Sequence, residues 1–234
     1  MQLAARVVEP CQHAPGARLM ALKGFPDEGA ATASQLWRAV LYAAEMGATV
    51  VNNSWSCSAP CPSNPLAEDV LVVMEALGSV VVTSAGNRMA DVSLYRPENT
   101  GLVLTVGAIG HDESLASFSN KGWGVDVVAP GGGPSTGGGV RVPRRNILSL
   151  APLAGLENEE LFIIDGRYRR LAGTSMSAPH VAGAVALLKS VAPDLTPHEV
   201  RAEGSPKREH AGVSSCKMLT IYSVTPRQRV TKSW

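Results

Sequence analysis

The sequence predicts an α/β fold, a three-layer domain in which a mostly parallel sheet carries helices on both faces. Three observations lead to this class. Short Val-rich runs alternate with amphipathic helical patterns along the chain, which is the order expected of strand–helix–strand units. The runs are almost entirely apolar, as strands buried on both faces of a sheet are. The chain has 23 glycines but only 3 Phe, 4 Tyr and 4 Trp, so small residues rather than aromatic rings fill the contacts between elements.

The composition sets further limits. A length of 234 residues with 45% hydrophobic and 18% charged residues is typical of one globular domain with a buried core. The net charge of +1 provides no excess of positive charge for phosphate backbones or anionic lipid, so neither nucleic acid nor a membrane is expected as a partner. No apolar run approaches the ~20 residues that span a bilayer, and the first ten residues lack the apolar core of a signal peptide.

The first half of the chain contains two strand–helix–strand units. Residues 17–22 have the Leu and Met content of a buried strand, and strands are also expected at 48–52 and 80–83. The first helix covers about 34–46, is capped by Thr32 or Ser34 and ends before Gly47. Its inward side chains are Leu36, Val40 and Ala44. The second helix covers about 64–77, is capped near Ser63 and ends before Gly78. Its inward side chains are Leu66, Val70, Val73, Met74 and Leu77.

The second half continues the pattern. Further strands are expected at 102–106, 125–128, 147–150 and 168–172. The glycine-rich stretch 131–139 fits no phosphate-binding motif and is interpreted as a flexible connection. A helix covers 175–188, and a second begins at Thr196 with a capping box. Residues 203–234 show no usable periodicity and are basic, so we expect them to be unstructured.

The four cysteines are Cys11, Cys57, Cys61 and Cys216. Only Cys57 and Cys61 are close in sequence, and a zinc site would need a second close pair. These residues therefore predict no metal site. Two interpretations remain open, idle or buried thiols and a small loop disulfide between Cys57 and Cys61.

One serine has the surroundings of a nucleophile. The stretch 173–183, GTSMSAPHVAG, follows a predicted strand directly and opens a helix, which places the Ser175 hydroxyl at the first turn. The unpaired N–H groups and the positive end of the helix dipole at that point suit an oxyanion formed when a hydroxyl attacks a carbonyl. A lone serine at that position would more often be a simple helix cap.

The stretch closely resembles the nucleophile motif of the subtilisin-like serine proteases, the subtilases. Further segments resemble the same family in the same order: VVNNSW at 50–55, TSAGN at 83–87, VGA at 106–108, ASFSN at 116–120 and VVAPG at 127–131. The G-x-S-x-G elbow of the α/β-hydrolases is absent, because Ser177 occupies its final position. The resemblance implies a partial subtilase peptidase domain over 14–201, a non-matching remnant at 1–13 and a basic, unstructured tail at 202–234.

The resemblance also implies roles for individual residues. Ser175 is the expected nucleophile, and Asn87 is the expected side-chain donor that binds the oxyanion together with the Ser175 backbone N–H. Substrate binding is implied for two segments, which are Ser54, Trp55 and Ser56 along the peptide backbone, and Ser84, Ala85 and Gly86 around its main side chain. Ser56 stands where the family commonly has glycine, so it is expected to crowd the substrate backbone.

The general base and its aspartate are not found. In the family they come from segments before the one that resembles 14–18, and only thirteen residues precede it here. His13 lacks the required context, and His180, five residues after Ser175 on a helix, is interpreted as structural. The remaining histidines fall in a loop, a terminal helix and the tail: His111, His198 and His210.

The sequence therefore predicts a serine-type endopeptidase that acts on polypeptides through Ser175 and is impaired by the missing base and aspartate. Three alternatives stay open: a non-catalytic peptide-binding module, a truncated or frame-disturbed product without activity, and an esterase with a different base. No cofactor is expected. The resemblance allows for calcium, although no ligands are identifiable, and it suggests secretion.

Overall fold

The computed structural model describes residues 14–26, 31–133, 145–150, 163–164 and 168–204. Its centre is a parallel sheet of order β1-β2-β3-β4. The strands are β1 (Val50–Asn53), β2 (Val80–Ser84), β3 (Leu104–Ile109) and β4 (Val127–Pro130). A second, antiparallel sheet has the order β5-β7-β6. It comprises β5 (Ile147–Leu150), β6 (Ile163–Ile164) and β7 (Tyr168–Leu171).

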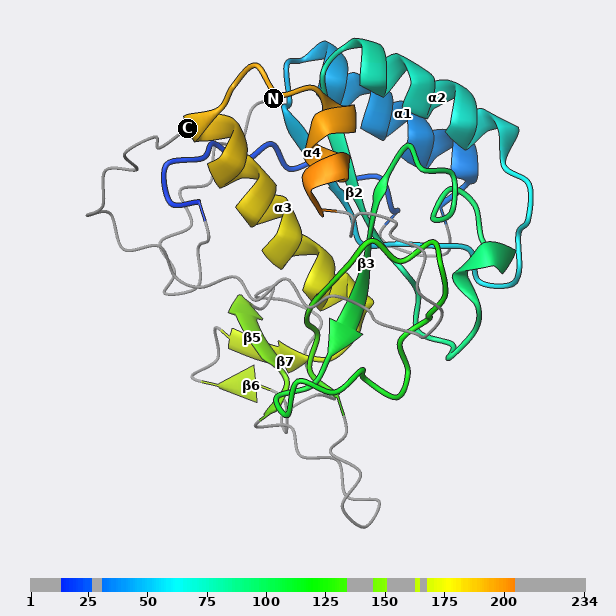
Figure 1. The fold of residues 1–234 in the computed structure, drawn as a ribbon, viewed down its shortest axis with the longest axis vertical. Helices are drawn as coiled ribbons and strands as arrows, with labels where there is room; N and C mark the ends of the chain where they lie inside the picture. Colours follow the sequence, from blue (N-terminus) through cyan, green and yellow to red (C-terminus); the bar gives the residue numbers. More distant parts are fainter. Residues whose placement is uncertain (1–13, 27–30, 134–144, 151–162, 165–167, 205–234) are drawn as a thin grey trace, which may run out of the picture.

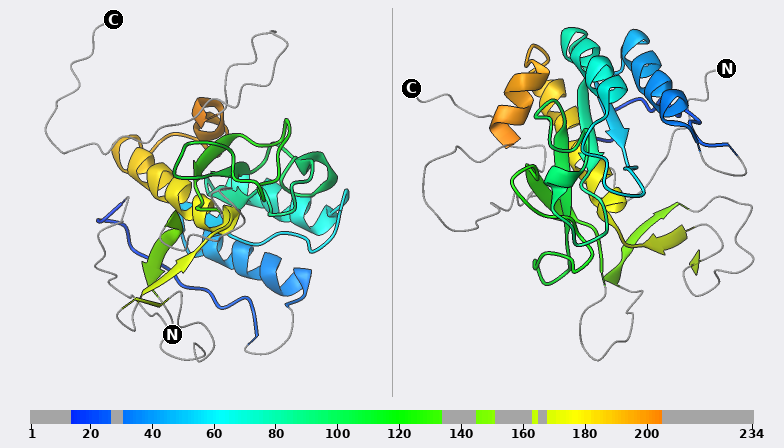
Figure 2. Two further views of the ribbon diagram at one scale, coloured as in Figure 1. Left: turned by 90° about the horizontal axis from the view of Figure 1, so that it is seen from below. Right: turned by 90° about the vertical axis from the view of Figure 1, so that its right-hand side faces the viewer.

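Helices cover both faces of the parallel sheet (Figures 1 and 2). α1 (Ala33–Glu45) and α2 (Pro65–Ala76) lie on one face, and α3 (Thr174–Val191) and α4 (Pro197–Gly204) lie on the other. Alternate residues of β2 point to opposite faces. Val80 and Val82 pack in the cluster that contains α3, whereas Val81 packs in the cluster that contains α1 and α2. The predicted three-layer α/β architecture is confirmed.

Local sequence explains the helix boundaries. Thr32 caps α1 in a complete capping box with Gln35, and Gly47 follows the helix with φ 82°. The cap of α2 is Asn64 rather than the predicted Ser63, with Pro65 in the first turn. The prediction of its inward face was partly wrong, because Leu66, Val73 and Leu77 are exposed. The residues that pack against α1 and the sheet are Ala67, Val70, Leu71 and Met74.

The predicted strand at 17–22 is wrong. Residues 17–24 form no helix or strand, and Leu19, Met20 and Leu22 are exposed. An apolar, extended segment becomes a strand only when its N–H and C=O groups pair with a neighbour. In the described part of the chain, β1 pairs with β2 alone and no strand pairs with 17–22.

Two further strand predictions need correction. β3 and β4 each begin two residues later than predicted. β5 occupies the predicted 147–150 but pairs antiparallel with β7, outside the parallel sheet. The residues of β5 and β7 are half-buried or exposed, as expected of a small sheet at the edge of the domain.

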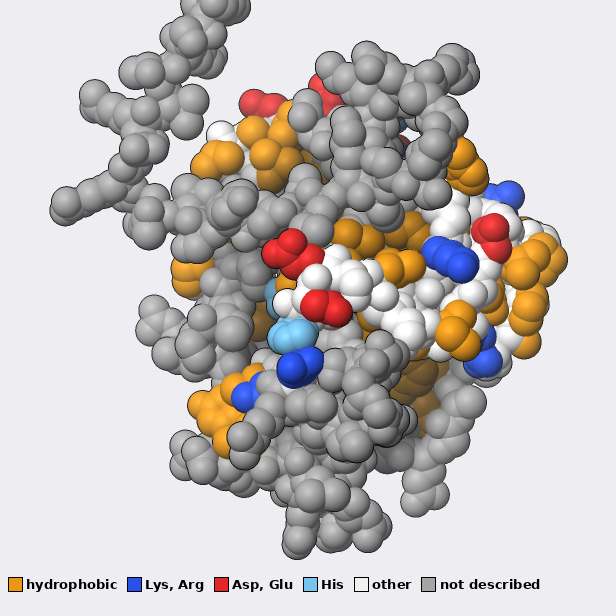
Figure 3. Space-filling view, turned by 60° about the horizontal axis from the view of Figure 1, so that its bottom comes forward, with side chains coloured by type: hydrophobic (Ala, Val, Ile, Leu, Met, Phe, Trp, Pro, Cys, Tyr) orange, Lys and Arg blue, Asp and Glu red, His pale blue; other side chains and the backbone are white. Residues whose placement is uncertain are grey.

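Several predictions lie outside the described residues. These concern the remnant 1–13 with His13, most of the glycine-rich 131–139, and the tail from 205 onward with His210. Among the described helices, none is long and apolar enough to cross a membrane. On the face shown in Figure 3, charged side chains are scattered singly or in small groups among hydrophobic and uncharged ones.

Candidate active site

Three segments meet where the parallel strands end. Ser54 directly follows β1, Asn87 comes three residues after β2, and Ser175 lies in the first turn of α3. The carboxyl ends of parallel strands are the usual place for a ligand site in such sheets. The N-terminus of α3 is held there by a hydrogen bond from the Gly173 N–H to the Gly131 carbonyl, 2.8 Å. A side chain at Gly131 would collide with Ser177 Oγ and Ala108 Cβ, so glycine permits this close approach.

Ser175 and Ser54 exchange two hydrogen bonds. The Ser175 hydroxyl donates to the Ser54 carbonyl at 3.1 Å, and the Ser54 hydroxyl donates to the Ser175 carbonyl at 2.9 Å. The second bond follows from Pro179 inside α3. Proline has no N–H, so the Ser175 carbonyl lacks its ordinary helical partner four residues later and accepts from Ser54 instead. Pro179 thereby leaves the Ser175 carbonyl free to accept the hydrogen bond that joins the start of α3 to the predicted substrate-binding segment 54–56.

The Asn87 amide is oriented by Thr174. Its Oδ1 accepts from the Thr174 N–H at 2.8 Å and from the Thr174 hydroxyl at 2.9 Å. Because the amide oxygen is engaged, the amide NH₂ is the group left to donate to a ligand. Thr174 is fully buried, and its hydroxyl also accepts from the Gly86 N–H at 3.1 Å. Thr174, which immediately precedes Ser175, therefore joins the nucleophile turn to the Asn87 loop.

Asn120 holds the same loop from the other side. Its amide donates to the Ala85 carbonyl at 2.8 Å and accepts from the N–H groups of Arg88 and Ala90 at 3.0 and 3.1 Å. The side chain is 1% exposed. Sequence reasoning assigned no role to Thr174 or Asn120. Both lie inside segments that carry the family resemblance, but the pairing of distant side chains with this loop leaves no spacing pattern in the sequence.

The six predicted substrate-binding residues divide into two groups. Ser84, Ala85 and Gly86 are buried, whereas Ser54 and Trp55 are half-buried and Ser56 is exposed. The Trp55 ring packs edge-on against Trp37 of α1 with centroids 5.1 Å apart, so its side chain belongs to the core. Ser56 Oγ lies 3.6 Å from the point that a Cβ on Gly86 would occupy, which sets the two segments side by side.

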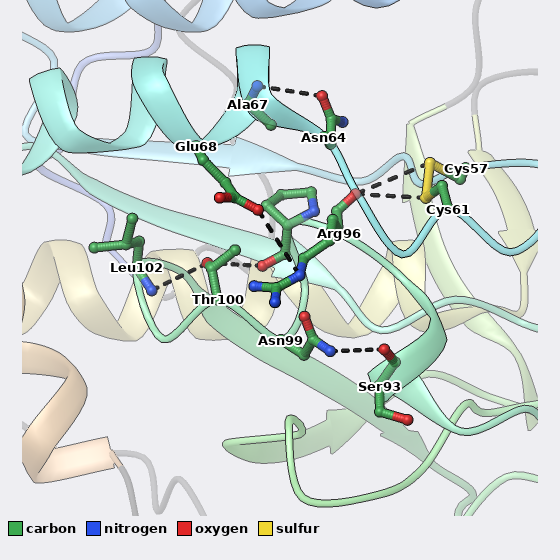
Figure 4. Close-up of polar contacts among 11 residues, drawn as sticks. Cys57, Cys61, Asn64, Ala67, Glu68, Ser93, Arg96, Asn99, Thr100 and Leu102 are labelled. Carbon is green, nitrogen blue, oxygen red and sulfur yellow. Dashed lines mark hydrogen bonds and ion pairs between the residues drawn. A yellow bond between two sulfur atoms is a disulfide. The ribbon is translucent and has the colours of Figure 1, made fainter.

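The open question about the cysteines is resolved by a disulfide between Cys57 and Cys61, with Cα atoms 6.3 Å apart. The disulfide closes a short loop, residues 57–61, that directly follows the 54–56 segment. The same loop is paired with residues 94–96, because the Cys61 N–H donates to the Leu94 carbonyl and the Arg96 N–H donates to the Cys61 carbonyl. Figure 4 shows the Arg96 carbonyl facing both sulfur atoms.

The described histidines are His111, His180 and His198. His111 is exposed after β3, and His198 is exposed on α4. His180 lies on α3 with Nδ1 2.7 Å from the Met176 carbonyl. In the described ranges, the hydrogen bond of the Ser175 hydroxyl goes to Ser54. Within the same ranges, no three His, Cys, Asp or Glu side chains gather into a cluster that could hold a metal ion, so no step is assigned to calcium.

Comparison with known proteins gives consistent results. A sequence model of the subtilase family matches residues 11–204. The chain is 37% identical over 177 residues to a thermophilic serine proteinase of Bacillus sp. (strain AK1), covering 76% of this chain and 37% of that protein. It is 32% identical over 188 residues to subtilisin Savinase of Lederbergia lenta, covering 80% of this chain and 59% of the relative.

Solved structures agree. A protease of Pseudoalteromonas arctica PAMC 21717 superposes with a TM-score of 0.62 and 30% identity, over 74% of this chain and 51% of that one. The chain thus spans between about a third and three fifths of the length of the proteins it matches.

Proposed function

Because this chain belongs to the subtilase family, we propose that it is a serine-type endopeptidase domain that cleaves polypeptides through an acyl-enzyme at Ser175. The Ser175 oxygen attacks the scissile carbonyl, and the carbonyl oxygen becomes an oxyanion. The C–N bond then breaks, and the amine leaves with the proton given up by the hydroxyl. Water attacks the resulting ester, which releases the second product and restores the serine.

The observation that carries this proposal is the fixed orientation of Asn87. With its Oδ1 held by Thr174, its NH₂ is available beside the turn that carries Ser175. The proposed oxyanion site consists of this NH₂ and the backbone N–H of Ser175 at the positive end of α3. Both donors are neutral and held in place before substrate arrives, so little reorganisation is needed as negative charge develops.

We further propose that catalysis by this chain is impaired. A serine hydroxyl stays protonated near neutral pH and attacks poorly unless a base takes its proton. Among the described residues, the Ser175 hydroxyl contacts a backbone carbonyl and no histidine. A carbonyl oxygen is too weak a base to accept the proton. In subtilisin, loss of Ser or His lowers kcat by about 10⁶ and leaves roughly 10³–10⁴ over the uncatalysed rate.

The test is hydrolysis of an extended peptide with a fluorogenic leaving group by the wild-type chain, Ser175→Ala and Ser117→Ala. Ser117 is exposed, and its side chain makes no hydrogen bond to the residues that the structure describes, so it is a matched control. We expect slow hydrolysis that disappears in Ser175→Ala and persists in Ser117→Ala. Hydrolysis that survives in Ser175→Ala would contradict the role of Ser175, and rates ordinary for proteases would contradict the impairment.

The second candidate is a non-catalytic peptide-binding module. The bond from the Ser175 hydroxyl to the Ser54 carbonyl favours it, because that hydroxyl is then engaged in joining the first turn of α3 to the 54–56 segment. An extended peptide would pair with the 54–56 backbone as an added strand. Peptide binding of equal affinity in the wild-type chain and Ser175→Ala, without turnover in either, would identify this function.

We also infer that the protein is secreted. The disulfide between Cys57 and Cys61 is stable in oxidising surroundings, whereas cytosolic thiols are kept reduced. Thiol labelling of the protein recovered from its native source tests this, and reduced Cys57 and Cys61 would argue against secretion.

A further inference from the structure

Ser54 and Ser175 are joined by two hydrogen bonds that behave differently during the proposed reaction. In one, the Ser175 hydroxyl donates to the Ser54 carbonyl at 3.1 Å. This bond is lost when the Ser175 oxygen gives up its proton and attacks a carbonyl. In the other, the Ser54 hydroxyl donates to the Ser175 backbone carbonyl at 2.9 Å. Neither group of this second bond takes part in the chemistry, so it is the one of the two that persists during acyl transfer.

The direction of the persistent bond is set by Asn52 of β1. The Asn52 amide nitrogen donates to the Ser54 hydroxyl oxygen at 2.9 Å. Because this nitrogen only donates, the Ser54 proton is left for the Ser175 carbonyl. That carbonyl needs a donor, since Pro179 has no N–H to offer it four residues later. Asn52, Ser54 and Ser175 thus form a chain of hydrogen bonds, in which each bond polarises and strengthens the next.

The nucleophile is held on both of its sides along the chain. Just before it, the Thr174 N–H donates to Asn87 Oδ1 at 2.8 Å, which fixes the turn relative to the proposed oxyanion donor. Just after it, the Ser175 carbonyl is fixed to the segment 54–56, along which a peptide is proposed to pair. Attack needs reacting atoms about 3–3.5 Å apart, and a misplacement of about 1 Å can lower the rate by about 10². The second link therefore sets the distance from the nucleophile to a bound peptide.

We propose that Ser54 is a positioning residue, whose hydroxyl keeps the Ser175 backbone against the peptide-binding segment while the Ser175 hydroxyl leaves its own bond to attack. The inference rests on the proposed acyl transfer at Ser175. It gives the Ser54 side chain a function besides that of its backbone, which is expected to pair with the substrate. A peptide held along 54–56 needs this alignment, whereas a small ester that does not reach the segment does not.

The test compares two p-nitrophenyl esters, one of an N-acetylated tetrapeptide and the other of acetate, by the maximal rate at which each acylates Ser175. The rates in Ser175→Ala are subtracted. In Ser54→Ala, the peptide ester should react at least about tenfold more slowly, and the acetate less than about threefold more slowly. Ser54→Thr keeps the hydroxyl and should restore the peptide-ester rate. Ser117→Ala, which changes an exposed serine, should leave it unchanged.

Peptide binding separates positioning from recognition. Calorimetry with the amide of the same tetrapeptide should give the same Kd for wild type and Ser54→Ala, because the peptide pairs with the Ser54 backbone. Equal peptide-ester rates in the two proteins would overturn the proposal. A Kd weakened enough to account for the slower reaction would also overturn it, as would an equal loss with both esters, which would indicate a disturbed turn.

A second variant keeps the test decisive if Ser54→Ala does not fold. The Asn52 side chain is exposed, and Asn52→Ala leaves the Ser54 hydroxyl without the group that directs it. The peptide ester should then react about threefold more slowly, as loss of one modest hydrogen bond does, and an unchanged rate would overturn the proposal. The proposed endopeptidase activity fails separately. No acylation of Ser175 in wild type would contradict both proposals, whereas acylation that is insensitive to Ser54 would remove only the positioning role.

Discussion

The buried carboxyl of Glu98 should make the stability of the fold depend on pH in an unusual direction. In the native state its pKa is about 7, whereas the ordinary value is 4.5. Between these values the native chain holds a proton that the unfolded chain releases. Stability therefore falls as pH rises from about 4.5 to about 7 and levels off above that. At about 1.4 kcal/mol for each tenfold change in proton affinity, the loss is about 3 kcal/mol.

Glu98→Gln removes this ionisation. The stability of the variant relative to the wild-type chain should therefore increase as pH rises. The gain in free energy of unfolding between pH 5 and pH 8 should be about 3 kcal/mol. Urea unfolding followed by tryptophan fluorescence at several pH values measures it, with Glu45→Gln on the exposed surface of α1 as the matched control. Other carboxyl groups also make stability depend on pH, because hydrogen bonds from Ser93 and Ser114 lower the pKa of Asp91 and Asp112. The effect of Glu98 is therefore taken from the difference between variant and wild type. A difference in free energy of unfolding between Glu98→Gln and wild type that stays constant from pH 5 to pH 8 would show that the native-state pKa of Glu98 is not raised.

Two further predictions concern the framework of the site. Asn120→Ala leaves the Ala85 carbonyl and the N–H groups of Arg88 and Ala90 without their partner. The free energy of unfolding, measured in urea, should therefore fall by about 2–4 kcal/mol. A loss below about 0.5 kcal/mol would show that Asn120 does not hold the loop. Replacing Cys57 and Cys61 together by serine opens a short loop and should cost about 2 kcal/mol. The same urea experiment on wild type with and without reductant checks the disulfide, and identical midpoints would contradict its contribution.

Much of the fold could be predicted because its signals are local. Thr32, Gly47 and Thr196 mark helix ends by side-chain or backbone chemistry within a few residues, and the structure has these ends. The alternation of Val80, Val81 and Val82 between two cores likewise follows from an apolar strand. The strand at 17–22 failed because pairing depends on a neighbour far along the chain. The pairing of β5 with β7 was missed for the same reason.

The site divides in the same way. Ser175 and Asn87 could be named because short motifs carry them, and their catalytic roles remain predictions. Thr174 and Asn120 orient the Asn87 loop through contacts across 87 and about 30 residues of sequence, which no spacing reveals. Sequence reasoning could not single out the buried Glu98 either, because its distinguishing property arises only on folding: among the described residues, its carboxylate oxygens have no hydrogen-bond partner.

The proposed function requires that Ser175 and Asn87 form one site for acyl transfer. The most direct measurement is the rate at which an activated ester acylates the chain, followed by intact mass and peptide mapping, in wild type and Asn87→Ala. We expect a single acyl group on Ser175 that forms more slowly in Asn87→Ala. Loss of the corresponding donor in subtilisin costs roughly 10²–10³ in kcat, which indicates the size of effect to expect. Acylation elsewhere, or equal rates in both proteins, would contradict the claim.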